Sequence, residues 1–391
     1  MRHKTSWISC SALAILLGSS SASAVDIPTG TEDFTISVDG DLQFRSENTY
    51  GGPAPTATSG AAPSGHLNMD FFMRRASLAA RGTAYKLFWY YLKLETGRFG
   101  SRGDYSTSSL LQDVVVGIVP FKDVYIEGGF LKTPLSRPAV DSAPRNNSLE
   151  GVSDILMYPN TRAQRQTGAQ IRALLFDQRF LIRVGGYEGA RTGVSGGRPT
   201  TPSFGTPFVN PQGVPMVAGM ARLNLIGADT GYTYSQIYAD GSSHLSVGVG
   251  GQYQPHSGSP KDSTTVYDYS ALAADVFVDM ALPGDMEALF ILDGYRFDWG
   301  PGKPKTGNGL HGEGGFRWGP IEPQLNFYWF NSDTKVNSFL RLAGGLNYYL
   351  HGHHAKLQLE YETTIANGIL PDHPNMTPWT RQILLQAQIE F

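Results

Sequence analysis

The chain has 391 residues, a net charge of −3 and a mean hydropathy of −0.22, with 46 glycines, 20 phenylalanines and 19 tyrosines. A nucleic-acid-binding protein of this size would usually be basic, so the charge argues against that class. No apolar run reaches the roughly 18 residues of a membrane-spanning helix, which excludes a helical membrane protein. Abundant glycine and aromatic residues with a negative mean hydropathy suit strands that have one apolar face.

Residues 1–24 have the features of a secretory signal peptide. A basic start at Arg2 and Lys4 precedes the apolar stretch Ala12–Leu17 and a small-residue cleavage site. Removal of this segment takes away Cys10, the only cysteine, so a disulfide framework and a thiolate metal site are excluded. It also reduces the 31 basic residues by two, which leaves 29 against 34 acidic residues and a net charge of −5.

The remaining residues, 25–391, are predicted to form one transmembrane antiparallel β-barrel of about 16 strands. Apolar and polar residues alternate with a period of two, which gives each strand one apolar and one polar face. Many runs reach the roughly 9–11 residues of a spanning strand, whereas strands of soluble sheets average about 5–6. The predicted strands, in chain order, are Phe34–Arg45, Asn68–Gly82, Lys86–Gly97, Leu110–Val119, Val124–Lys132, Thr167–Phe176, Arg179–Glu188, Val217–Ile226, His244–Gln254, Val266–Ala281, Asp285–Asp298, Leu310–Trp318, Ile321–Asn331, Asn337–Leu350, His354–Thr364 and Trp379–Phe391.

The segment Gly227–Ser243 is the ambiguous part of this pattern, because Tyr232–Tyr238 within it could be a strand or an elaborated turn. A single-chain bacterial barrel has an even number of strands and carries its short turns on one side. Counting the stretch as a strand gives 17 and moves the tight turn Leu282–Gly284 to the side of the long loops. Counting it as a turn gives 16 strands, a number compatible with a water-filled channel, so we predict a turn.

The last predicted strand indicates how the sheet closes. Its apolar face ends on Phe391, and its other face, apart from Leu384, carries Gln382, Gln386, Gln388 and Glu390. The final strand of an outer-membrane barrel must pair with the first strand to close the sheet in lipid. We therefore expect Trp379–Phe391 to pair with Phe34–Arg45, its apolar face toward outer-membrane lipid, and Phe391 to be recognised by the barrel-assembly machinery.

If the apolar faces meet lipid, the polar faces line a lumen. The basic residues expected there are Arg45, Arg75, Arg81, Lys93, Arg172, Arg183, Arg222, Arg317, Arg341 and Lys356. The acidic residues expected there are Asp39, Asp41, Glu95, Asp113, Glu127, Asp275, Asp279, Glu287, Asp293, Glu313, Glu322, Glu360 and Glu362. The assignment is least defined in Val266–Asp298, where both faces carry apolar residues. Charges of one sign would select ions, whereas a mixture screens itself, and each charge could instead pair with a cross-strand neighbour.

The segment Thr133–Arg165 is the expected constriction. At about 33 residues it is longer than loops usually run without a function, and it would narrow the pore if it folded inward; the alternative is an external loop. Arginine suits phosphate and carboxylate because its planar fork binds them through two hydrogen bonds. The charged residues of this segment, with a net charge of +1, are Arg137, Arg145, Arg162 and Arg165 against Asp141, Glu150 and Asp154.

Signals for catalysis and metal binding are weak. His351, His353 and His354 are crowded, but they lie in a tight turn and are expected to be solvated rather than metal ligands. Lys303–Gly309 lacks phosphate-loop spacing, and neither G-x-S-x-G nor H-E-x-x-H occurs. We expect no enzyme and no cofactor. Two alternatives stay open: a barrel lipase with Ser and His on adjacent strands, and a secreted β-rich binding protein with its apolar faces inside.

Four stretches carry a family resemblance: Phe72–Gly82, Leu111–Pro120, Gly129–Ser136 and Arg165–Ile171. In order and spacing they look like the R-R-A-x-L, D-x-x-x-G-x-x-P, G-x-F-K-T-P-F-S and G-x-Q segments of the phosphate-selective porin O and P family of Gram-negative outer membranes. The match is clearest over about Asn68–Gly189. The resemblance implies a 16-stranded homotrimeric porin whose third long loop folds inward, and the passage of phosphate or polyphosphate along basic lumen residues.

Residue by residue, Arg75 and Arg81 match the family's basic second-strand pattern, and Lys132 matches its F-K-T-P lysine. Leu131 stands where the family usually has Phe. The predicted lumen also has more acids than bases, whereas the family's anion preference needs Arg and Lys to dominate.

The sequence thus predicts a passive diffusion channel for small neutral or anionic hydrophilic solutes. It is expected in the outer membrane of a Gram-negative cell, after export through the periplasm, without a nucleic-acid partner. The residues predicted to line the channel and bind anions are Arg75, Arg81, Lys93, Lys132, Arg137, Arg145, Arg162, Arg165, Arg172, Arg183, Arg222 and Arg341.

Overall fold

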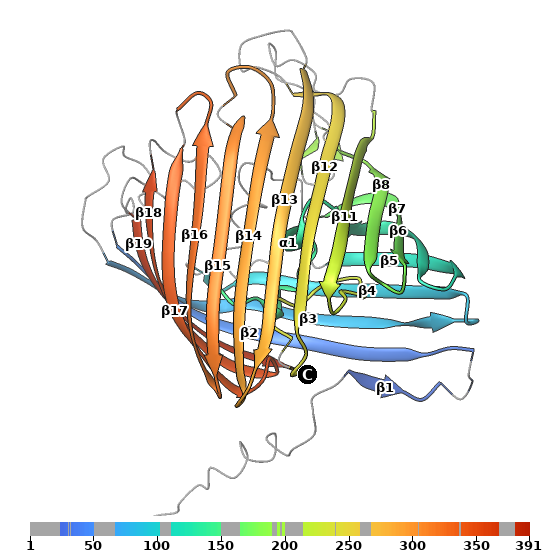
Figure 1. Cartoon of the computed structure of the whole chain (residues 1–391), viewed down its shortest axis with the longest axis horizontal. Coiled ribbons are helices and arrows are strands. Elements are labelled where there is room, and N and C mark those ends of the chain that lie inside the picture. Colours follow the sequence, from blue (N-terminus) through green and yellow to red (C-terminus); the bar gives the residue numbers. More distant parts are fainter. Residues whose placement is uncertain are drawn as a thin grey trace, which may run out of the picture.

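The computed structural model describes residues 24–29, 31, 33–50, 67–101, 111–149, 165–189, 194–195, 198–199, 214–238, 240–258, 267–303, 305–335, 338–366 and 380–391. Sixteen antiparallel strands in these ranges form one closed barrel, shown in Figure 1. They are β2 (Ile36–Tyr50), β3 (Leu67–Ala84), β4 (Phe88–Phe99), β5 (Leu111–Phe121), β6 (Val124–Lys132), β7 (Arg165–Leu175), β8 (Phe180–Tyr187), β11 (Met216–Ile226), β12 (His244–Gly258), β13 (Tyr267–Leu282), β14 (Met286–Asp298), β15 (Gly307–Trp318), β16 (Ile321–Ser332), β17 (Phe339–His351), β18 (Ala355–Ala366) and β19 (Thr380–Glu390). The predicted fold class is therefore confirmed.

A few short elements accompany the barrel. The strand β1 (Val25–Ile27) pairs with the first residues of β2, and β9 (Val194–Ser195) pairs with β10 (Arg198–Pro199). Two helical turns follow β6: α1 (Arg137–Val140) and the 3₁₀ turn Ala143–Arg145. Within that part of the chain, no helix is both long enough and apolar enough to cross a membrane.

Each predicted strand corresponds to one barrel strand, and the predicted turn is confirmed. β11 pairs directly with β12 across residues 227–243, and the short connections all lie at one end of the barrel, which we call the short-turn end. In one of these connections Tyr85 and Lys86 both have positive φ angles, as a hairpin turn that follows the sheet twist requires. The first strand was predicted too short at Arg45, because the backbone pairs with both β3 and β19 as far as Tyr50 although the alternation fades.

The closing pair is β19 with β2, as predicted. Phe391 and Gly40 exchange two backbone hydrogen bonds, N to O, of 2.9 and 2.8 Å. The phenylalanine ring lies over this glycine, because a Cβ added at Gly40 would sit 2.9 Å from the ring atom Cζ. On the opposite face, Gln43 Nε2 donates to Gln388 Oε1 at 2.8 Å and Arg45 Nη2 donates to Gln386 at 2.8 Å. Both faces of the last strand therefore hold the sheet closed.

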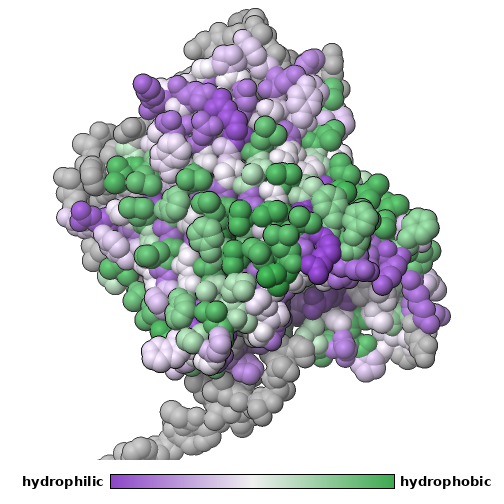
Figure 2. All heavy atoms as spheres, viewed as in Figure 1, coloured by the Kyte–Doolittle hydropathy of each residue, from purple (hydrophilic) through white to green (hydrophobic). Residues whose placement is uncertain are grey.

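The outer surface of the barrel is apolar. Leu325 on β16 is 71 % exposed and Leu272 on β13 is 63 % exposed, whereas Glu322 and Asp275 on the same strands are buried. In Figure 2 apolar side chains gather over the middle of the strands, and hydrophilic ones gather at the top of the view, at the end opposite the short turns. An apolar belt of this kind would drive aggregation in water, so it is a lipid-facing surface. This arrangement is the reverse of the soluble alternative, whose apolar faces would point inward.

Candidate functional site

The inward faces of the strands carry the charged residues that were predicted to line a lumen. Most of them pair with opposite charges across or along the wall. Described pairs include Arg75–Glu95 and Arg165–Asp113 at 2.9 and 3.0 Å, Arg172–Glu127 and Arg317–Glu287 at 2.8 Å, Lys93 with Asp41 and Glu95 at 3.6 and 3.5 Å, Arg222–Asp275, and Arg341–Glu362. The wall is thus a mixture of both signs rather than a ladder of one sign.

The inner wall also has an apolar patch, which explains the two apolar faces of Val266–Asp298. The inward residues of β13 and β14 that are buried include Tyr269, Phe277, Leu289, Ile291, Tyr295 and Phe297. Leu135 and Ala139, which follow β6, belong to the same buried cluster as Tyr269 and Tyr295. The segment that follows β6 therefore packs inside the barrel against this apolar patch.

The described part of the predicted constriction, residues 133–149, lies inside the barrel. It contains α1 and the 3₁₀ turn, and its residues from Thr133 to Val140 are buried. Ser136 Oγ lies 2.9 Å from Tyr295 Oη of β14, and Arg145 Nη2 lies 3.0 Å from Glu390 Oε1 of β19. The expectation that this loop folds inward rather than outward is met for these residues; residues 150–164, with Glu150, Asp154 and Arg162, lie outside the described part.

The charged wall binds the backbone of this loop. Ser148 N donates to Glu313 Oε1 at 2.8 Å, and Leu149 N donates to Glu360 Oε2 at 3.0 Å. In the opposite sense, Lys356 Nζ donates to the carbonyl of Asn146 at 2.8 Å. A loop inside a barrel has backbone N–H and C=O groups that strands of the sheet do not satisfy. Acids of the wall accept hydrogen bonds from its N–H groups and a lysine donates to a carbonyl, so charges of both signs hold this loop.

A second segment folds inward from the short-turn end, and sequence reasoning missed it. Within Gly227–Ser243, Tyr232 donates its hydroxyl to Asp113 Oδ1 at 3.2 Å and accepts a hydrogen bond from Lys132 N at 2.8 Å. Further along, Ile237 is buried beside Phe277 and Leu289. The signal was its 17-residue length, at an end where the other connections have two to four residues, together with its tyrosines. The turn was predicted correctly, but its position in the lumen was not.

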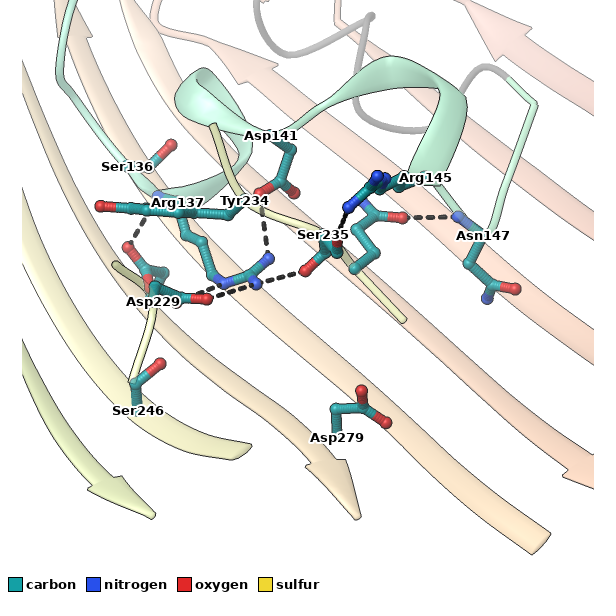
Figure 3. A network of polar contacts seen from close by, with 12 residues as sticks. Ser136, Arg137, Asp141, Arg145, Asn147, Asp229, Tyr234, Ser235, Ser246 and Asp279 are labelled. Atoms are coloured by element: carbon teal, nitrogen blue, oxygen red, sulfur yellow. Dashed lines mark hydrogen bonds and ion pairs between the residues drawn. The ribbon is translucent and has the colours of Figure 1, made fainter. Parts of the chain in front are cut away.

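Arg137 joins the two inward segments, as Figure 3 shows. Its Nη1 lies 2.9 Å from Asp141 Oδ1, and its Nε and Nη2 each lie 3.3 Å from Asp229, which belongs to the second segment. It also donates to the carbonyl of Ser235, and its guanidinium lies 3.4 Å from the centre of the Phe277 ring. With a side chain only 1 % exposed, it is a buried bridge rather than a residue presented to solvent.

The electrostatics of this bridge follow from burial. Burial alone would lower the pKa of Arg137, but the carboxylates of Asp141 and Asp229 raise it above its ordinary value. Burial raises the pKa of Asp141 to about 6, against the lowering influence of Arg137. At neutral pH Arg137 is therefore a cation beside the Asp141 carboxylate.

The backbone completes the contact between the segments. Asp141 and Tyr234 form an isolated parallel β-bridge, and Ser142 N donates to the carbonyl of Tyr234 at 2.7 Å. Gln236 N donates to the carbonyl of Arg145 at 3.2 Å. The loop and the turn segment thus form one hydrogen-bonded unit across the lumen.

The predicted anion-binding residues have the following positions. Arg75, Lys93, Arg165, Arg172, Arg222 and Arg341 lie in the wall pairs given above. Lys132 donates to the carbonyl of Asp141, Arg183 donates to Tyr232 and Gly231 carbonyls, and Arg137 and Arg145 lie in the loop. Arg81 is exposed and lies 3.2 Å from Asp39. Arg162 is outside the described residues. The structure thus gathers most of them around the two inward segments.

One of the three turn histidines differs from its prediction, whereas His351 is exposed as expected. His353 is not solvated: it is buried, and its Nε2 meets the carbonyl of Ile237 in the second segment. Burial lowers the pKa of His353 well below its ordinary value, so Nε2 carries its proton toward that carbonyl. Among the described residues no group of His, Asp or Glu is arranged to hold a metal ion.

Comparison with known proteins agrees with the fold. No family model matches the chain, and no curated protein sequence matches it. Among solved structures it is similar to OprB of Pseudomonas putida (TM-score 0.61, 8 % identity, covering 91 % of this chain and 94 % of that one) and to an anion-selective porin from Comamonas acidovorans (TM-score 0.56, 10 % identity, covering 92 % and 100 %). It is also similar to OmpT of Vibrio cholerae in a trimer form (TM-score 0.51, 11 % identity, covering 91 % and 99 %). These neighbours show the barrel fold, and the exposed apolar belt on its outer surface is consistent with the predicted location in the outer membrane.

Proposed function

We propose that this protein is a passive channel through which small hydrophilic solutes diffuse across the outer membrane. One observation carries the proposal: two segments, one entering from each end of a lipid-facing barrel, meet in its lumen and are held there by the charged wall. A diffusion channel needs a polar interior and a fixed constriction, since the constriction sets which solutes pass.

Uptake of neutral sugars tests this function directly. Proteoliposomes containing the purified protein are placed in isotonic solutions of sugars of increasing size, and swelling is followed by light scattering. We expect rapid swelling with small sugars and a sharp loss of uptake at a defined size. Swelling no faster than in empty liposomes, with a barrel that shows heat-modifiable gel migration, would contradict the proposed function.

The anion and phosphate preference implied by the family resemblance stays a prediction. The ion pairs favour weak selectivity, because a base that already meets a carboxylate adds little net field to the lumen. Arg172 beside Glu127 and Arg165 beside Asp113 are examples, at 2.8 and 3.0 Å. The predicted export signal over residues 1–24 and the homotrimer also stay predictions, the trimer supported by the OmpT structure in a trimer form.

The enzyme alternative has less support. The described residues include one Ser–His contact in the second segment, where Ser242 Oγ lies 2.8 Å from His244 Nε2. A hydrolytic triad needs a carboxylate that orients the imidazole, but Asp240 accepts its hydrogen bond from Ser242 itself, at 2.5 Å. This geometry does not activate the serine.

A further inference from the structure

The segment Gly227–Ser243 is larger than its place in the chain requires. β11 and β12 stay paired up to Ile226 and Leu245, so a turn of two to four residues, as elsewhere at this end, would connect them. Seventeen residues with a buried interior are therefore available for another role.

The segment crosses the lumen from one wall to the other. On one side, Tyr232 lies against Trp89 and Tyr91 of β4, with ring centres 6.0 and 5.5 Å apart. On the other side, Ile237 packs on β13 and β14, and its carbonyl meets His353 of the β17–β18 turn. A segment that crosses the lumen in this way reduces its open cross-section. It does so beside Leu135 and Ala139, near the start of the predicted constriction loop.

The segment also covers two of the predicted anion-binding arginines. Arg172 Nη1 donates to the carbonyl of Thr230 at 2.9 Å. Arg183 donates from Nη1 to the carbonyl of Tyr232 and from Nη2 to that of Gly231, both at 2.9 Å, and it is fully buried. These partners are neutral oxygens, so they occupy the hydrogen-bonding edges of the guanidinium groups while leaving the positive charge in place. The same edges are what a phosphate or carboxylate would bind.

We propose that Gly227–Ser243 is the selectivity element of the channel, which narrows the lumen and withholds Arg172 and Arg183 from passing anions. The inference rests on the proposed function and adds to it which segment sets the ion preference. With the segment in place, a solute meets a wall of balanced charge. Without it, the same solute meets the guanidinium of Arg183, together with Nη1 of Arg172, whose Nε stays paired with Glu127.

Shortening the segment tests this assignment. In the full-length protein, residues 228–243 are replaced by an Asn-Gly turn, and single-channel conductance and reversal potential are measured in a KCl gradient across planar bilayers. We expect a larger conductance and a reversal potential shifted toward anions. Adding Arg183→Met to the shortened protein is expected to return the reversal potential toward the wild-type value while the conductance stays high, because only the charge is removed.

A milder variant covers failure of the shortened barrel to assemble. Asp229→Asn keeps the segment but weakens its hold on Arg137, and we expect brief openings to a higher conductance level. Asp177→Asn is the matched control, since it removes an exposed carboxylate in another turn at the same end and should leave the current steady. Unchanged conductance and selectivity in the shortened protein, or identical records for the two Asp→Asn variants, would overturn the inference. A wild-type protein that passes neither ions nor sugars would overturn the proposed function instead.

Discussion

Replacing Arg137 by methionine removes the buried bridge between the two inward segments. Methionine keeps much of the apolar stem against Phe277 but leaves Asp141 and Asp229 facing each other without a cation. Removing one partner of a buried, hydrogen-bonded ion pair costs about 3–5 kcal/mol. The barrel strands hold their own backbone pairing, so this cost falls on the docking of the segments rather than on the barrel.

A cost of this size changes the ratio of docked to undocked segments by roughly 10²–10⁴-fold, at about 1.4 kcal/mol for each factor of ten. The matched control is Arg296→Met, which breaks an ion pair with Asp333 of similar geometry, at 2.7 Å, but with side chains 40 % and 46 % exposed. Exposed pairs contribute about 0–1 kcal/mol, so this variant should behave as the wild type.

Single-channel recording distinguishes the two variants. We expect Arg137→Met to show frequent transitions between conductance levels and faster proteolysis within residues 133–149, while its heat-modifiable gel migration stays normal. The reasoning would be refuted if Arg137→Met gave the same steady current and the same proteolysis pattern as Arg296→Met.

Further predictions concern closure, pH, lipid contact and processing. Deleting Phe391, or replacing Gly40 by leucine where the ring lies 2.9 Å from the added Cβ, should lower the yield of heat-modifiable, membrane-inserted barrel; normal assembly of both would count against the closing pair. Because burial raises the pKa of Asp141 to about 6, its carboxylate is charged above that pH and neutral below it, so the reversal potential should shift toward anions as pH falls through about 6, and Asp141→Asn should make that shift smaller. The same raised pKa means that ionisation of Asp141 favours the unfolded state. As pH rises from about 4 to 6, the free energy of unfolding should therefore fall more in the wild type than in Asp141→Asn. Leu325→Arg on the lipid face should lower the free energy of unfolding of the barrel in vesicles by about 2–4 kcal/mol if this position lies at the bilayer midplane. An unchanged value would contradict the lipid-facing orientation of Leu325 on β16. Mass spectrometry of the exported protein should show a chain that begins at Val25.

The strands were predictable because alternation and turn spacing are local properties of the sequence. For the same reason Gly227–Ser243 could be predicted as a turn, because the other short turns all fall on the same side of the barrel. The strand that ends on Phe391 was predicted to close the barrel because the last strand of a barrel must pair with the first. The backbone hydrogen bonds between Phe391 and Gly40 confirm this pairing.

The candidate site was less predictable because alternation gives the direction of a side chain but not its partner. Arg183 was assigned correctly to the inward face, yet the carbonyls that it binds belong to a segment 48 and 49 residues away. His353 was predicted to be solvated because its turn is short, and this was wrong because the second segment covers it. Such contacts depend on how two inward segments meet, and no local periodicity records that.

We infer that lumen charges of both signs pair with one another and hold the inward segments, and therefore give little net ion selectivity. The reversal potential of the wild-type channel in a tenfold KCl gradient, measured with and without added phosphate, tests it most directly. We expect stable openings, a reversal potential close to zero and no block by phosphate. A reversal potential near the chloride limit, with block of the chloride current by phosphate, would show that cations of the lumen meet passing anions and would contradict this account.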